Sequence, residues 1–279
     1  MKPRSGYWGI LTDMDHTTGI NELEFCSLDL ETTGVNPAFD RIVEIGAVRF
    51  TTAGVINEYQ KLVNPGVSIP PNVIKIHGIT DSMVEGAPLI NDILDEFYEF
   101  FKGAILVIQN PRFDLSFIER AFHVRDGKSP ELKAIDTVNL AQKHFPALPN
   151  HKISTLANHL GLNLQSHRAL DDAIACMSIF TEVIKGRGLI TYGELMRMHG
   201  DMVRPGLRYS QGSTREPWRR LVIGKDVKIR YKDTDGRVTS RIIHPREFIQ
   251  YGKSSYILAW CYLRESERCF MASRIVSIE

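Results

Sequence analysis

Four acidic residues lie in segments whose other side chains favour a buried environment. Asp29 and Glu31 interrupt the apolar segment SLDLETTG, and Asp114 follows an aromatic residue in NPRFDLSF. The fourth acid, Asp172, comes five residues after His167 in SHRALDDA. Carboxylates gathered from distant segments repel one another unless a cation lies between them, and in proteins that cation is usually a divalent metal ion. A fold that joins these segments would therefore build a metal site.

The spacing of the first two acids places them on one side of a strand. Residues i and i+2 of a β-strand point to the same face, so Asp29 and Glu31 project together while the leucines beside them face the other way. Two carboxylates at a strand end favour a hard cation. The turn TTG follows, and we expect the exposed amides and hydroxyls of Thr32 and Thr33 to meet a phosphate or a sugar.

The third segment combines a histidine with the fourth acid. We expect His167 on the loop before a helix and Asp172 in the first turns of that helix. The acid can then bind a metal ion while the imidazole accepts a proton from water, because histidine exchanges protons near neutral pH. Asp171 is rotated by about 100° from Asp172 on an α-helix, so we interpret it as a solvated neighbour.

Length and composition allow one large domain or two unequal ones. The chain has 279 residues, of which 43% are hydrophobic and 24% are charged, as in ordinary folded proteins. No apolar run approaches the roughly 18–20 residues that span a bilayer, and the N-terminal stretch lacks the features of a secretory signal, so we expect a cytoplasmic protein. The cysteines show no CxxC spacing, and we interpret Cys26, Cys176 and Cys261 as small core residues.

The net charge of +1 conceals an asymmetry between the two parts of the chain. Residues 1–186 contain 16 basic and 23 acidic residues, whereas residues 187–279 contain 18 and 10. An acidic first part and a basic second part indicate two modules, the second suited to a polyanion. An ordinary solvated basic surface is the alternative interpretation.

Residues 22–186, which follow an N-terminal extension over 1–21, show the patterns of an α/β domain. Strands are expected in EFCSLDLE, RIVEIGAVRF, VINEYQKLV and AILVIQN. Helices are expected in APLINDILDEFYEFFKG, PRFDLSFIERAF, ISTLANHLGL and ALDDAIACMSIFTEVIKG. In the last of these helices we expect an apolar stripe through Ile174, Met177 or Ser178, and Thr181.

The pattern changes in the last third of the chain. Residues 187–217 are expected to form a linker with one possible helix in YGELMRMHGDM, followed by the segment RPGLRYSQGSTREP. Residues 218–279 consist of short alternating runs separated by the turn signals DTDG, PREF and YGKS. This pattern of short alternating runs and turns predicts an all-β module of about five strands, arranged as a small barrel or a twisted sheet.

Taken in order, the motifs of residues 22–186 resemble those of the DEDDh (DnaQ-like) 3′→5′ exonucleases. The matching segments are DLETTG, HGIT, QNPRFDLSF, IDTVNLAQKHFP, HKISTLANHLGL and HRALDDA. The resemblance implies a ribonuclease H-like α/β fold with a mixed sheet flanked by helices. It also implies that two Mg²⁺ or Mn²⁺ ions are held by four catalytic acids and that His167 is the general base. The implied metal ligands are Asp29, Glu31, Asp114 and Asp172.

The same resemblance suggests contacts to the nucleic acid. His77 matches a loop that flanks the terminal nucleotide, Asn110 matches a family position, and Phe113 could stack on a base, although a core position is the alternative for this aromatic residue. Gln109 stands where the family often has histidine. That histidine is not a metal ligand, so we expect the departure to leave activity intact.

Residues 218–279 resemble the WYL domain through the run VKIRYKDTDGRVTSRIIHPREFIQYGKSSYILAWCYLRESERCFMASRIVSI. The triplet that gives the domain its name is degraded to Ser255-Tyr256-Ile257. The resemblance implies an SH3-like β-barrel that binds ligands, often nucleic acids, in bacterial regulators. Candidate phosphate contacts, with ordinary surface arginines as the alternative, are Arg264, Arg268 and Arg274.

These observations predict a metal-dependent 3′→5′ exonuclease acting on single-stranded DNA, with the basic module holding or sensing the strand. Two alternatives stay open. The first is a 3′→5′ exoribonuclease that trims RNA, and the second is a non-catalytic regulator that binds nucleic acid through a relic of the exonuclease fold.

Overall fold

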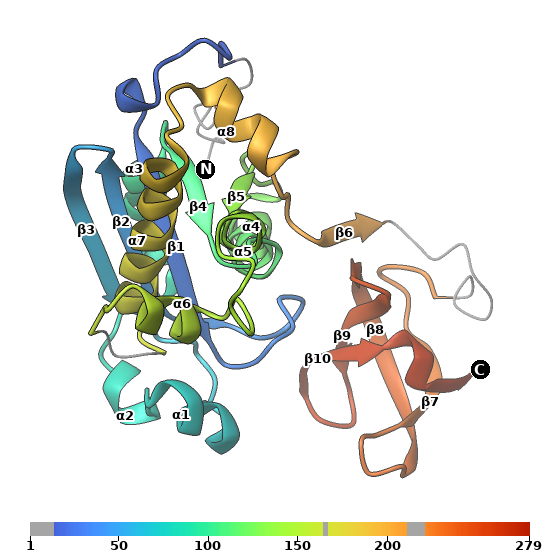
Figure 1. Cartoon of the computed structure of the whole chain (residues 1–279). Helices are drawn as coiled ribbons and strands as arrows, with labels where there is room; N and C mark the ends of the chain where they lie inside the picture. Colours follow the sequence, from blue (N-terminus) through green and yellow to red (C-terminus); the bar gives the residue numbers. More distant parts are fainter. Residues whose placement is uncertain (1–13, 164–166, 211–220) are drawn as a thin grey trace. The chain divides into compact units, whose positions relative to one another are not determined.

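A computed structural model describes residues 14–163, 167–210 and 221–279, and contacts divide the chain into two units (Figure 1). The first unit comprises Met1–Val35 and Arg41–Pro205, and the second comprises Asn36–Asp40 and Gly206–Glu279. Most of the N-terminal extension expected over residues 1–21, and the last part of the expected linker, lie outside the described residues.

The first unit is built on a five-stranded mixed sheet, as expected. The strand order is β3-β2-β1-β4-β5. β1 pairs antiparallel with β2 and parallel with β4, so the sheet changes from an antiparallel half to a parallel half at β1. The strand bounds are β1 Phe25–Thr32, β2 Ile42–Thr51, β3 Gly54–Leu62, β4 Ile105–Ile108 and β5 Ala134–Asp136.

Helices cover both faces of this sheet (Figure 1). Leu28 and Leu30 pack in a core with α3 (Ile90–Phe101) and α4 (Arg112–Asp126). Phe25 points to the other face, where its ring lies 4.8 Å from that of Phe180. The helices of that second face are α5 Thr137–His144, α7 Ala169–Arg187 and α8 Tyr192–His199. The shorter helices are η1 Ile20–Glu22, α1 Pro71–His77, α2 Asp81–Val84 and α6 Ile153–His159.

Helix α7 buries a different face from the expected one. The expected stripe of Ile174, Met177 or Ser178, and Thr181 is only partly buried. The fully buried residues include the small Ala173 and Cys176 together with Phe180. Small side chains at the start of the helix allow it to approach the sheet closely, and the larger Phe180, Val183 and Ile184 are buried further along. None of the described helices is long and apolar enough to cross a membrane.

The second unit is all-β, as expected, around a core that includes Ile229, Ile243, Ile257 and Phe270. The strand order is β10-β9-β8-β7-β11, and β6 also pairs with β8. In the described part of the chain this path runs from one edge to the other without closing, so an SH3-like closed barrel is not shown. The strand bounds are β6 Leu207–Ser210, β7 Val227–Lys232, β8 Val238–Tyr251, β9 Ser254–Cys261, β10 Ser266–Met271 and β11 Ile275–Ile278, with η3 at Ala272–Arg274.

Two expectations about this unit were wrong. The segment PREF is not a turn, because β8 continues through it with an irregular register between Pro245 and Glu247. Such a bulge lets proline stay in a strand, because the bulge removes the need for its missing amide hydrogen. The expected linker also contains a strand, β6, whose Arg208 lies opposite Gln250 of β8. Cys26, Cys176 and Cys261 are buried free thiols, as expected.

Candidate active site

The C-terminal end of β1 directs two acids toward α7. Asp29 and Glu31 share a face of the strand with Phe25, whereas Leu28 and Leu30 enter the opposite core. Their partners on β2 are Gly46 and Glu44, respectively. The strand alternation predicted from the sequence therefore holds, and both acidic residues are half-buried under the start of α7.

Asp114 reaches this strand end from the first turn of α4. Its carboxyl Oδ1 accepts a hydrogen bond from the backbone N–H of Leu30 at 3.1 Å, so the acid is attached to β1 between the other two acids. The helix starts after Asn110, whose φ of 54° lies in the left-handed region. Asp136 stabilises that turn, because its Oδ1 accepts the Asn110 N–H at 3.2 Å and the Val138 N–H at 2.9 Å.

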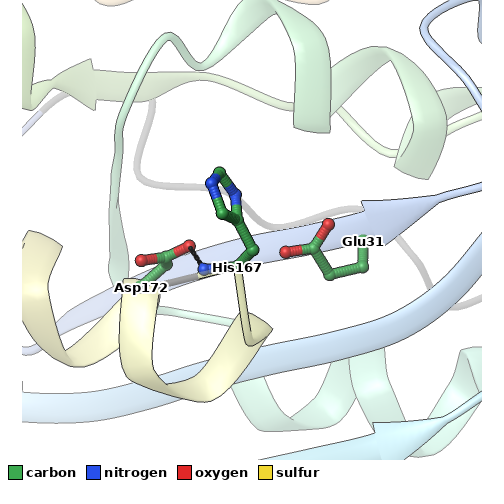
Figure 2. A group of neighbouring side chains, drawn as sticks. All are labelled: Glu31, His167 and Asp172. Atoms are coloured by element: carbon green, nitrogen blue, oxygen red, sulfur yellow. Dashed lines mark hydrogen bonds between the residues drawn. The ribbon is translucent and has the colours of Figure 1, made fainter. Parts of the chain in front are cut away.

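His167 and Asp172 come from the start of α7. His167 has a φ of 63°, and its backbone N–H donates to Oδ2 of Asp172 at 3.0 Å. Figure 2 shows the carboxyl groups of Glu31 and Asp172 beside His167. One ligand atom from each of these three residues lies within 4.8 Å of the other two, a spacing that a single cation can bridge. Asp172 is buried, whereas His167 is exposed and open to a substrate.

The surroundings of the four acids disfavour their ionised forms. Burial, reinforced by the charges of Asp114, Asp172 and Glu31, raises the pKa of Asp29 well above its ordinary value. Burial, with the charges of Asp172 and Glu44, raises the pKa of Glu31 to about 8. Burial also raises the pKa values of Asp114 and Asp172. Carboxyl oxygens crowded in this way are a donor set that fits a hard divalent cation, which would remove the repulsion.

The two threonines after β1 are buried, so the expectation that they are exposed was wrong. Thr32 donates its hydroxyl hydrogen to the carbonyl of Gly34 at 2.6 Å. The hydroxyl oxygen of Thr33 accepts a hydrogen bond from the N–H of Arg41 at 3.0 Å. The backbone N–H of Thr33 donates to the Arg41 carbonyl. Both side chains therefore shape the turn that follows the acids.

The other family positions have mainly structural contacts. His77 is buried, and its Nδ1 accepts the N–H of Ile79 at 2.9 Å. Phe113 is partly buried, and its ring centroid lies 4.9 Å from that of Phe117, in agreement with the core alternative. Gln109, which replaces the usual histidine, donates to the His151 carbonyl at 2.9 Å and accepts from the Thr137 hydroxyl at 2.6 Å. We see in these bonds a local reason for glutamine at this position.

The three candidate arginines all belong to the second unit. Arg264 is exposed in the turn after β9, and Arg268 is exposed on β10 opposite Ala259. Arg274 is half-buried in η3.

Sequence reasoning did not single out Glu44, Asp136 or Arg168. For Asp136 a signal existed, because an aspartate before TVNL is a typical helix N-cap, and its side chain does cap α5.

Family comparison divides the chain as the residue patterns do. The family described as "Exonuclease" matches residues 26–180, and the WYL domain matches residues 219–279. Exonucleases of this family depend on divalent metal ions. The first match includes all four acids and the histidine of the site just described.

Relatives and solved structures agree with this assignment. The chain is 40% identical over 163 residues to the DNA polymerase III subunit epsilon of Treponema pallidum, covering 57% of this chain and 76% of that protein. It is 39% identical over 165 residues to a PolC-type DNA polymerase III of Caldanaerobacter subterraneus, of which it covers only 12%, against 59% of this chain.

Among solved structures, Exonuclease X in complex with 5′ overhanging duplex DNA is 26% identical, with a TM-score of 0.51, over 63% of this chain and 99% of that one. Exonuclease I of E. coli in complex with a dA16 oligonucleotide shares the fold, at 21% identity and a TM-score of 0.53, over 59% of this chain and 41% of that one. The chain belongs to the exonuclease family and is a 3′→5′ exonuclease of the DEDDh, DnaQ-like type with a C-terminal WYL domain.

Proposed function

We propose that this exonuclease removes nucleotides from the 3′ end of single-stranded DNA, with two Mg²⁺ or Mn²⁺ ions and with His167 as the general base. One observation carries the proposal. Acids from β1, α4 and α7 converge beside an exposed histidine, in a place where burial and mutual repulsion disfavour their ionised forms. Such a site gains stability from divalent cations and can then accept an anionic phosphodiester.

Each residue of the site has a distinct part in the proposed reaction. Asp29, Glu31, Asp114 and Asp172 would hold the two ions, which supply positive charge at the scissile phosphate when bound. His167 would accept the proton of the attacking water, and its exposure gives that water access. The hydrogen bond from the His167 backbone to Asp172 links the base to the acid, so that both keep one relative position.

Single-stranded DNA is the substrate that the comparisons favour. The relatives at about 40% identity are named as a DNA polymerase III subunit and a PolC-type DNA polymerase III, which supports DNA over RNA. A site that attacks a terminal phosphodiester must receive a frayed end, which a single strand provides directly. Trimming of RNA is the competing outcome of the experiment below.

The substrate is tested with 5′-labelled oligonucleotides of one sequence, prepared as single-stranded DNA, as RNA and as blunt duplex DNA. With Mn²⁺ or Mg²⁺ we expect a ladder of products shortened from the 3′ end, formed fastest from single-stranded DNA and abolished by EDTA. Faster degradation of the RNA would replace the DNA proposal with an exoribonuclease, and full activity in EDTA would exclude the metal mechanism.

The site residues are tested by isosteric substitution in the full chain. Asp29→Asn and Asp172→Asn should abolish hydrolysis while binding of the oligonucleotide persists. His167→Gln should lower kcat by about 10²–10⁴-fold. Asp171→Asn is the matched control, because this neighbouring acid belongs to α7 but is not one of the proposed ligands. Equal losses in the control and in Asp172→Asn would contradict the assignment.

We also propose that the second unit binds the nucleic acid strand through its basic residues and adopts an SH3-like arrangement. The excess of 18 basic over 10 acidic residues in 187–279 supports an anionic ligand. Arg264 and Arg268 are exposed, and an arginine fork matches phosphate oxygens. The test of this role is the salt dependence of binding given in the Discussion.

A further inference from the structure

A fifth acid, Glu44, lies beside the site but outside the proposed set of metal ligands. It stands on β2 directly opposite Glu31 of β1, and its side chain is completely buried. Like charges at opposed positions of neighbouring strands repel each other, and a buried ionised carboxyl group is costly without partners. The position therefore requires a specific structural explanation.

Glu44 is held as an anion by donors from two other elements. Arg168 donates through its terminal nitrogen to Oε1 at 2.7 Å and through Nε to Oε2 at 3.2 Å, so the ion pair is bidentate. The backbone N–H of Ala169 donates to Oε2 at 3.1 Å, and Gln60 of β3 donates to Oε1 at 3.0 Å. Although burial acts in the opposite direction, these bonds lower the pKa of Glu44 below its ordinary value.

Through these bonds a strand residue caps a helix that lies about 125 positions further along the chain. Arg168 is the N-cap residue of α7, and its side chain makes no capping bond. Glu44 instead accepts the free N–H of Ala169 in the first turn, where helix amides lack internal partners. Gly46, two residues along β2, lets the backbones touch, because a Cβ there would lie 2.0 Å from the carbonyl carbon of Ala169.

The contact is adjacent to the proposed base. His167 has a left-handed backbone conformation and immediately precedes Arg168, the residue that pairs with Glu44. The first turn of α7 supplies Asp172, which accepts the His167 N–H. A displacement of Arg168 would therefore move the imidazole, whereas Asp29 and Asp114 are held by β1 and α4 and would keep their places.

We propose that Glu44 and Arg168 are positioning residues, and that their partly buried ion pair fixes the start of α7 so that His167 faces the acids of β1. The inference rests on the proposed role of His167 and extends it. Neither residue is proposed to contact the reacting atoms. Their effect on the reaction passes through the base, which makes the inference separable from a general effect on folding.

The test is a double-mutant cycle in the full chain, with kcat and KM measured under steady-state conditions on single-stranded DNA with Mn²⁺. Glu44→Gln keeps the size and the acceptor but removes the charge. We expect it to lower kcat by about tenfold or more, with KM changed by less than about threefold. In a His167→Gln background the same substitution should lower kcat by less than about twofold, because the base on which it acts is gone.

Two further variants keep the test decisive. Removing one partner of a buried ion pair can unfold a protein, so Glu44→Gln/Arg168→Gln removes both charges together and should give the same kinetic pattern. The matched control is Glu24→Gln/Arg49→Gln, because Arg49 belongs to the same strand and pairs with Glu24 away from the acids. This control should leave kcat unchanged.

Hydrogen exchange gives a readout that does not depend on activity. The amide of Ala169 should exchange faster in Glu44→Gln than in the wild type, with no change in the control pair. An equal loss of kcat in the wild-type and His167→Gln backgrounds, or no loss in either, would overturn the inference and leave the proposed function standing. Wild-type kcat in His167→Gln alone would instead overturn the role of the base, and the inference with it.

Discussion

Replacing Glu31 by glutamine should stabilise the metal-free protein at alkaline pH. The pKa of Glu31 is raised from an ordinary value of 4.5 to about 8, mainly because the carboxyl group is buried. The folded state therefore keeps this proton to a higher pH than the unfolded state. The contribution of Glu31 to stability is lost as pH rises from about 4.5 through about 8, and it is unaffected below that window.

The magnitude follows from the separation of the two pKa values. A difference of about 3.5, at about 1.4 kcal/mol for each pKa unit, bounds the destabilisation at about 5 kcal/mol. Salt ions and local relaxation reduce that bound, so we expect Glu31→Gln to raise the free energy of unfolding at pH 8.5 by about 3 kcal/mol. For a chain of this size the melting temperature should rise by about 6 to 12 °C.

The assay is thermal and urea unfolding in EDTA at pH 5 and pH 8.5. Glu31→Gln should exceed the wild type only slightly at pH 5, just above the ordinary pKa of 4.5, and by far more at pH 8.5. Saturating Mn²⁺ should reverse the order at pH 8.5, because glutamine is the poorer ligand. Glu58→Gln, an exposed strand acid, is the control and should change little at either pH. Coincident curves at pH 8.5 in EDTA, or an equal gain at both values, would refute the reasoning.

Three further outcomes are expected. Gly46→Ala should destabilise the protein by about 2–4 kcal/mol in urea unfolding and lower activity, because its Cβ would overlap the backbone of Ala169, which cannot move aside. Asn110→Ala should cost about 1–2 kcal/mol in the same assay, whereas Asn110→Gly should be tolerated, because the φ of 54° lies in the left-handed region. The double substitution of Arg264 and Arg268 by glutamine should reduce the slope of log K against log salt for single-stranded DNA by about 1.4, since about two fewer phosphates are neutralised.

Each of these three substitutions is compared with a control variant. Gly86→Ala places a Cβ in open space and should be nearly neutral. Lys225 and Lys253 are exposed in the same unit, and their double substitution by glutamine should leave the salt slope closer to the wild-type value. An unchanged slope for the arginine pair would indicate that the second unit binds its ligand elsewhere. Equal stability of Asn110→Ala and Asn110→Gly would show that the turn relaxes.

The local sequence predicts which segments carry the residues of the active site. The alternation of a strand determines which residues share a face, so the two-residue spacing of Asp29 and Glu31 is enough to pair them. Helix start signals likewise locate the segments that carry Asp114 and Asp172. After residue 186 the charge becomes basic, and from residue 218 the residue pattern changes to short alternating runs, which indicates a second, all-β module.

Tertiary structure decided how those segments meet. The pair of Glu44 and Arg168 joins positions 124 residues apart, and no local pattern in either segment predicts the other. The buried face of α7 also departs from the expected stripe, because the start of the helix packs closely against Gly46 and buries the small Ala169 and Ala173 there. Local periodicity reports which residues share a face. Only the packed fold determines what that face contacts and which charges are neutralised there.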